Sequence, residues 1–160
     1  MLSFVLAAII GFVSTELIGF AVHRLAHWRG SRRLFHDHLE HHSKFYPPSR
    51  YTSERYLGDL RTSFMPWMVA VFALLDLFLI SIVHWKLFVP FFVAQATVGL
   101  LNNLVHDSFH VDGHWMARFA WHRRLKEKHR IHHENVRVNL GIYWSFFDRI
   151  LGSHRRSDGA

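Results

Sequence analysis

Three long apolar runs limit what this chain can fold into. Residues 2–21 contain Glu16 as their only charge, residues 64–85 are interrupted only by Asp76, and residues 87–105 carry no charge. A helix rises about 1.5 Å per residue and the apolar core of a bilayer is about 30 Å thick, so each run can cross a membrane once. None shows the polar face of a surface helix. The sequence therefore predicts an all-α integral membrane bundle with about three spanning helices.

The runs also divide the chain, whose 160 residues suit one core. We expect a single membrane-embedded domain over residues 1–160, with spanning helices at about 2–27, 64–85 and 87–110 and polar segments at 28–62 and 111–160. The first run lacks a basic start and a small-residue cleavage site, so we interpret it as a retained helix and not as a signal peptide.

The basic residues orient the helices. Of the 19 Lys and Arg residues, eight lie from Arg24 to Arg61 and ten from Arg118 onward, and only Lys86 lies between the second and third runs. The positive-inside rule then places the N-terminus outside and both basic segments in the cytoplasm, most simply at the inner membrane of a cell. Contact with anionic lipids accounts for the net charge of +7, and no motif indicates a nucleic-acid partner.

Local signals divide the two polar segments. Residues 29–31 predict a break before a short helix that runs through His42 and ends at the prolines of 46–48. Residues 115–133 have the pattern of an amphipathic, basic helix. The aromatic segment 139–153 is too short and too charged to span, so we expect it to lie on the membrane or to pack under the histidines.

Ten of the fifteen histidines form four motifs, and the chain has no cysteine, which excludes disulfides and thiolate ligands. Two HxxxH pairs stand at the ends of apolar runs, and two HxxHH triplets stand in the polar segments. On a helix, residues three and four apart have Cβ atoms about 5–6 Å apart, so their imidazoles can share a metal ion. The adjacent pair of HxxHH diverges, which would let one helix serve two metals. The motifs are His23 and His27; His38, His41 and His42; His106 and His110; and His129, His132 and His133.

Nitrogen ligands without thiolates suit iron, zinc, copper or nickel. The HExxH motif of zinc proteases is absent. Four acids close to the motifs are candidates to accept hydrogen bonds from the imidazole N–H groups and so orient the rings. They are Asp37, Glu40, Asp107 and Glu134.

The other titratable groups receive structural interpretations. Asp76, an acid in the middle of a spanning run, is a functional candidate by position, but we favour a hydrogen bond to Gln95 inside the helical hairpin. Five histidines lie outside the motifs, and we expect structural roles for them, with His36 and His114 the first exceptions to consider because they adjoin the motifs. The five are His36, His84, His114, His122 and His154.

The order HxxxH, HxxHH, HxxxH, HxxHH, followed by HRIHHENVRVNLGIYWSFFDRILGS, resembles the fatty acid hydroxylase and sterol desaturase superfamily of integral-membrane di-iron enzymes. The resemblance covers about residues 23–153. It implies two iron ions held by the ten histidines of the motifs (zinc could replace iron in purified protein) and O2 as co-substrate. The implied reaction is hydroxylation of a lipid C–H bond, for which we favour a fatty acyl chain. Electrons would come from an external ferredoxin- or cytochrome-type carrier with its reductase.

Members of that superfamily commonly have four spanning helices, whereas three are evident here. Closure of the bundle would then depend on the tail or on a second copy in a homo-oligomer. A carotenoid ring hydroxylase and a sterol-type oxidase or desaturase are alternatives within the superfamily. A non-catalytic membrane protein that binds metal or haem is the alternative from another class, although the histidines cluster at helix ends and do not face one another across the span.

Overall fold

The computed structural model describes residues 1–59 and 65–156, and every regular element among them is helical. The fold class predicted from the apolar runs is therefore confirmed. Short 3-10 turns and one π-helical turn, His41–Phe45, connect the longer helices. The helices are α1 (Leu2–Ala26), α2 (Arg33–Glu40), α3 (Met65–Ile82), α4 (Trp85–Phe109), α5 (Ala120–Glu134) and α6 (Phe146–Ile150).

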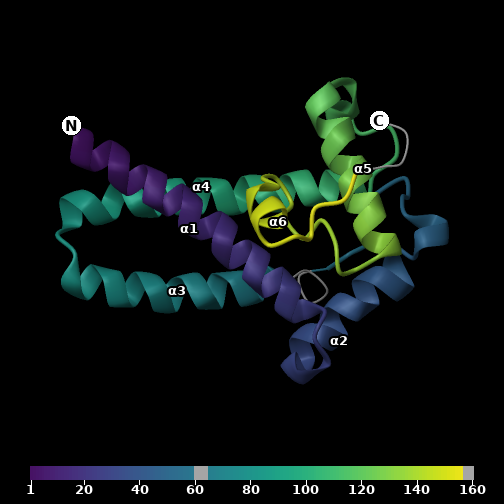
Figure 1. Cartoon of the computed structure of the whole chain (residues 1–160), viewed down its shortest axis with the longest axis horizontal. Coiled ribbons are helices and arrows are strands. Elements are labelled where there is room, and N and C mark those ends of the chain that lie inside the picture. Colours follow the sequence, from purple (N-terminus) through teal and green to yellow (C-terminus); the bar gives the residue numbers. More distant parts are fainter. Residues whose placement is uncertain (60–64, 157–160) are drawn as a thin grey trace.

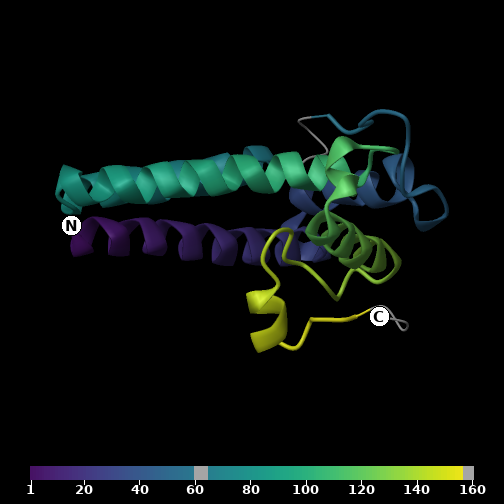
Figure 2. The ribbon, with the colours of Figure 1, turned by 90° about the horizontal axis from the view of Figure 1, so that it is seen from above.

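Three of these helices, α1, α3 and α4, are long and apolar enough to cross a membrane, as the sequence predicts. They form one elongated arm, with the N-terminus and the α3–α4 turn at its tip and α2 and α5 at the opposite end (Figures 1 and 2). Residue 64, where the second run was expected to begin, lies outside the described residues. The turn between α3 and α4 falls at Val83 and His84 and not at Lys86, which the expected spans of 64–85 and 87–110 leave between them, because α4 already begins at Trp85.

Close packing joins α1 to α4 along the arm (Figure 2). A Cβ atom added to Gly11 would overlap the carbonyl oxygen of Phe91 and lie 3.1 Å from its carbonyl carbon, so only glycine permits this approach. On the next turn of α1, the Thr15 hydroxyl donates to the Gly11 carbonyl at 2.7 Å and leaves no polar hydrogen facing the apolar contact. The two helices therefore meet backbone against backbone at this point, as small residues allow inside a membrane.

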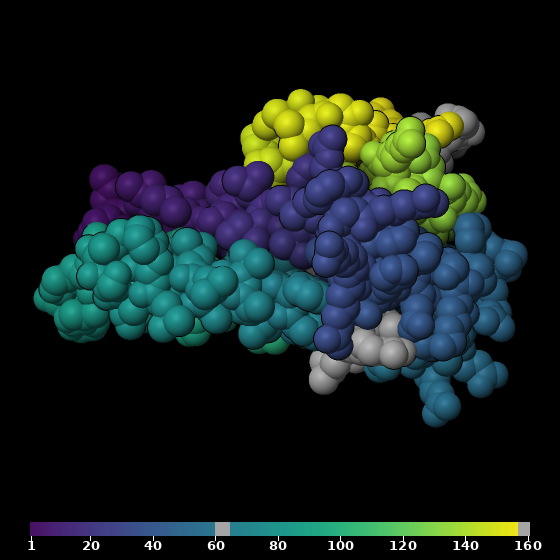
Figure 3. Space-filling view, turned by 90° about the horizontal axis from the view of Figure 1, so that it is seen from below, coloured from purple at the N-terminus to yellow at the C-terminus, as the bar shows by residue number. Residues whose placement is uncertain are grey.

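Helix α3 is attached more loosely. Met68 is its one buried residue among those described, and it packs with Val22, Ala26 and Leu34 where the arm meets α2. The outer face of α3 is exposed and apolar, with Leu74 71% exposed, as expected for a surface that lipid covers. Figure 3 shows α3 lying along the arm, with α2 and the segment after it at the broad end.

The C-terminal part of the chain folds back onto α1. Trp144 contacts Phe12 with ring centroids 5.3 Å apart, and Phe147 contacts Phe20 at 6.2 Å, so α6 packs against the spanning helix (Figure 2). The segment expected to form one helix over 115–133 is instead a 3-10 turn, Trp115–Arg118, followed by α5. The break at Phe119 has extended backbone angles, and His114 caps the 3-10 turn by accepting from the Met116 N–H at 3.3 Å.

The two glycines Gly11 and Gly99 should respond oppositely to alanine. Gly11→Ala must push α1 away from α4 and should destabilise the protein by about 1–3 kcal/mol, the usual cost of overpacking. Gly99→Ala should leave stability unchanged or raise it, because its added Cβ meets nothing within 4 Å and alanine favours helix. Thermal unfolding of both variants in the same detergent measures the difference, and equal melting temperatures would contradict this packing.

Candidate metal centre

Nine of the ten histidines in the sequence motifs fall into two compact groups at the broad end of the molecule. Within each group the ligand nitrogens all lie within 4.8 Å of one another, and every ring except His27 is buried. The first histidine group is His23, His27, His38, His42 and His132, and the second histidine group is His41, His106, His110 and His129. The tenth, His133, adjoins the second group, because its Nε2 lies 3.2 Å from Nε2 of His129.

The helical spacing explains how the motifs divide. Histidines four apart share a face and stay together, so each group receives two such pairs. The middle histidine of each HxxHH triplet points to the other group: His41 joins the second and His132 joins the first. The two triplets therefore bridge the groups, and the rings of His42 and His133 stack across the boundary with centroids 4.0 Å apart.

The distances between nitrogens fit ligands around a metal ion. In the first group, Nε2 of His27 lies 3.1 Å from that of His132 and 3.2 Å from that of His38. In the second, Nε2 of His129 lies 3.2 Å from that of His110. Two imidazole nitrogens bound at about 2.1 Å and at right angles stand about 3.0 Å apart. The donor set thus fits a pair of metal ions that bind imidazole.

Backbone carbonyls orient four of these rings. Each ring donates its Nδ1–H to a carbonyl oxygen, which leaves Nε2 unprotonated and directed into its group. The acceptors are Leu140 for His23 (2.6 Å), Val138 for His132 (2.8 Å), Tyr46 for His133 (2.8 Å) and Tyr51 for His110 (3.0 Å).

The acids named as candidates for this orienting role lie in different surroundings. Asp107 does contact a ring, with Oδ1 3.2 Å from Nδ1 of His106. Asp37 instead pairs with Arg33 at 3.7 Å, and Glu134 pairs with Arg130. Glu40 is half-buried at the end of α2. The sequence offered carboxylates as candidates to orient the rings. It could not show which backbone carbonyls would do so, because every residue has a backbone carbonyl.

Burial keeps two of the imidazoles outside the spanning helices neutral. It lowers the pKa of His27 to about 4 and that of His133 to about 3, so both carry free lone pairs at neutral pH. His41 is 1% exposed, and neither of its nitrogens has a hydrogen-bond partner among residues 1–59 and 65–156. A buried nitrogen left in that way is costly unless something binds it, which is a further sign that the second group takes a metal.

The tail supplies the loop that holds His23. Asp148 is fully buried and accepts hydrogen bonds from the N–H groups of Leu140 and Gly141, both at 2.8 Å. A Cβ on Gly141 would lie 2.8 Å from Oδ2 of Asp148, so the turn requires glycine. The aspartate of the FDRILGS segment thereby fixes the carbonyl that orients a histidine of the first group.

The five histidines outside the motifs also lie outside both groups. His122 is fully buried and its Nε2 lies 2.8 Å from the Ser108 hydroxyl, while His114 and His84 cap helical turns. His36 is exposed on α2, and His154 is half-buried in the tail. Asp76 meets Gln95 as expected, with the amide nitrogen 2.9 Å and 3.1 Å from the carboxylate oxygens when it is turned towards them.

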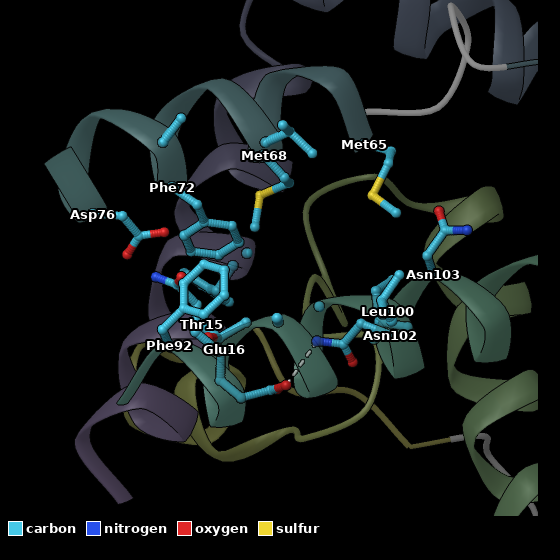
Figure 4. Close-up of a pocket in the computed structure, with 18 of the residues that line it drawn as sticks. Thr15, Glu16, Met65, Met68, Phe72, Asp76, Phe92, Leu100, Asn102 and Asn103 are labelled. Carbon is cyan, nitrogen blue, oxygen red and sulfur yellow. Dashed lines mark hydrogen bonds between the residues drawn. The ribbon is translucent and has the colours of Figure 1, made fainter. Parts of the chain in front are cut away.

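A cavity of about 660 Å³ lies between α1, α3 and α4 (Figure 4). It reaches His106 of the second group, which is one of its lining residues. Its walls are mostly apolar, including Met68, Phe72 and Phe92. Polar side chains enter it chiefly from α4, where three of them follow the first by seven, eight and eleven residues and so lie on one side of the helix. They are Gln95, Asn102, Asn103 and His106, with Gly99 between them.

Sequence reasoning missed the asparagines of this face. The signal was the helical spacing of polar residues at the end of an apolar run, at residues 95, 102, 103 and 106, which marks a spanning helix with one side turned away from lipid.

Comparisons with known proteins agree with the sequence motifs. The model of the fatty acid hydroxylase family matches residues 8–153. The Delta(7)-sterol 5(6)-desaturase erg3C of Aspergillus fumigatus is 33% identical over 70 residues, which cover 44% of this chain and 21% of the relative. The Delta(7)-sterol 5(6)-desaturase ERG3B of Gibberella zeae is 27% identical over 125 residues, or 73% of this chain and 36% of the relative. The chain thus spans about a fifth to a third of the length of these relatives, and no solved structure matches it.

The buried His122 should make stability fall in acid. Burial lowers its pKa to about 4 from 6.5, so the stability it contributes is present above pH 6.5 and is lost as the pH falls towards 4. We expect the wild-type melting temperature to fall by several degrees more than that of His122→Gln between pH 7 and pH 4.5. Glutamine can still donate to the Ser108 hydroxyl, so the variant removes the titrating group and keeps the hydrogen bond. Melting temperatures of the two proteins that fall equally with pH would contradict the prediction.

Proposed function

The chain belongs to the fatty acid hydroxylase family, and we propose that it is an O2-dependent di-iron oxygenase that hydroxylates a C–H bond of a membrane lipid. The substrate class we assign is a lipid with a fatty acyl chain. The ligands are the ten histidines of the motifs, five around each iron. A haem is a poorer fit, because it takes axial ligands on opposite faces of a wide planar ring, whereas five nitrogens here crowd within 4.8 Å.

One observation carries the proposal: the apolar cavity between the spanning helices reaches a histidine of the second group. A lipid can therefore enter from the bilayer and reach the metal centre without crossing water. The apolar walls exclude water from the reacting carbon. The backbone carbonyls of Tyr46 and Tyr51 orient the rings of His133 and His110 at the second group.

The reaction balances with an external reductant. One oxygen atom of O2 enters the substrate as hydroxyl and the other leaves as water, which takes up two electrons and two protons. A bound pair of iron ions supplies the O2 activation and the removal of hydrogen from an unactivated carbon. We assign the electrons to a ferredoxin- or cytochrome-type carrier in the cytoplasm. The basic segments and the histidines would lie on that side of the inner membrane, with the N-terminus outside.

Desaturation is the second candidate, favoured by the two relatives named sterol desaturases. It would use the same histidines and cavity, but both oxygen atoms would leave as water while the substrate loses two hydrogens. The product mass separates the two reactions, since hydroxylation adds one oxygen and desaturation removes two hydrogens.

A lipid comparison tests the activity. Expression in the native host lacking its own gene, under 18O2, should yield lipids that carry the label, and His132→Ala should abolish them because it removes a ligand of the first group. His36→Ala is the matched control, since His36 is exposed and outside both groups. Mass spectrometry of total lipids reads the result. Loss of hydrogens without label would establish desaturation, and no lipid sensitive to His132→Ala would refute the proposal.

Metal content tests the ligand assignment. Protein reconstituted with ferrous iron under anaerobic conditions should hold about two iron ions per chain, one for each histidine group. His27→Ala should reduce this to about one, because the second group remains intact, and His110→Ala should do the same through the other group. His84→Ala, at the far end of the arm, is the control. A wild-type content below one ion would contradict a paired site.

A further inference from the structure

The polar side chains of the cavity differ in what already satisfies them. Gln95 lies against Asp76, and Nδ2 of Asn102 donates to Oε1 of Glu16 at 2.7 Å, so each of these carboxamides is matched with a carboxylate of another helix (Figure 4). Such pairing is what polar groups need in an apolar region of a membrane protein. The pair of Gln95 and Asp76 closes on itself. The amide oxygen of Asn102 has no hydrogen-bond partner among residues 1–59 and 65–156, but it is fully buried.

Asn103 is arranged differently. Its amide nitrogen donates to Oδ2 of Asp107 at 3.2 Å, and this contact turns its amide oxygen towards Met65 at the start of α3, on the cavity side (Figure 4). Asp107 in turn contacts Nδ1 of His106 through its other oxygen at 3.2 Å. A carbonyl-type acceptor in the cavity is thereby connected through one carboxylate to a histidine of the second group.

The position of Asn103 sets its distance from the metal centre. It precedes His106 by three residues, or about 4.5 Å along the axis of α4. Gln95 is eleven residues from His106, about 16 Å along the same axis. A lipid group bound by Asn103 would therefore lie a few bonds from the carbon that reacts, while the apolar remainder fills the cavity towards Phe72 and Phe92.

We propose that Asn103 determines specificity by accepting a hydrogen bond from a hydroxyl group of the lipid substrate, near the carbon that reacts. The inference rests on the proposed function and narrows it to lipids that already carry a hydroxyl. An amide oxygen can only accept, so it recognises a donor and gives a pure hydrocarbon nothing in return. The contact positions the substrate, and the chemistry stays at the histidines.

Binding to metal-free protein tests this without turnover. Purified protein in detergent is offered an equimolar mixture of hexadecan-1-ol, 1-methoxyhexadecane and hexadecane, and native mass spectrometry counts the bound species. Wild-type protein should prefer the alcohol over both others by about tenfold, as one hydrogen bond in an apolar site provides. The ether keeps the oxygen and lacks the donor, so it should bind like the alkane.

Three variants separate recognition from structure. Asn103→Leu should reduce the preference for the alcohol to near one while the alkane still binds, whereas damage to the fold would lower all three ligands alike. Gln95→Leu removes the same group farther along the cavity and should leave the preference intact. Gly99→Leu should block the binding of all three ligands. Gly99 lines the cavity and nothing lies within 4 Å of an added Cβ, so the leucine side chain would occupy the space that a ligand needs.

The outcomes are decisive in either direction. Equal binding of alcohol and alkane to wild-type protein overturns the proposal, as does an ether that binds like the alcohol, and both results hold even if Asn103→Leu fails to fold. A preference lost in Gln95→Leu and kept in Asn103→Leu would also overturn it. A missing oxygenated product with an intact alcohol preference would count against the proposed function alone.

Discussion

The centre depends on the way backbone carbonyls fix the buried imidazoles. A neutral imidazole has one donor and one acceptor, and a carbonyl that takes the donor leaves the lone pair for a metal. The acceptors come from three different stretches, around Tyr46, Tyr51 and the loop 138–140. The helices that bear the histidines cannot assemble the site alone, because the irregular segments between them decide where each ring points.

Hydropathy predicted the three spanning helices and their bounds to within a few residues, because a bilayer demands long apolar runs. Helical spacing also indicated which histidines could act together. It could not indicate that His41 and His132 cross to the opposite groups, since this depends on how α2 and α5 approach the ends of α1 and α4. Tertiary packing also determined the carbonyl acceptors, which leave no mark in residue type. The cavity was not predicted either, although the spaced polar residues of α4 mark the side that faces it.

The tail shows how a segment remote from the helices shapes the site. Its aromatic residues pack on α1 and would have been equally consistent with lying on the membrane surface. Its aspartate is the informative part, because a fully buried carboxylate needs several donors, and Asp148 obtains them from Leu140, Gly141 and Ser153. A short motif at the end of the chain thus becomes the support for a ring near its beginning.

The division of each HxxHH triplet between two groups restricts how the chain can change its length. One residue inserted or deleted between His129 and His132 turns the rest of α5 by about 100° about its axis. His132 would then no longer face the first group, and His133 would no longer face the second. An insertion or deletion between His38 and His41 would displace His41 and His42 in the same way. Segments that supply no carbonyl to a ring can change length without turning these histidines, but the interval inside each triplet tolerates only substitutions of side chains.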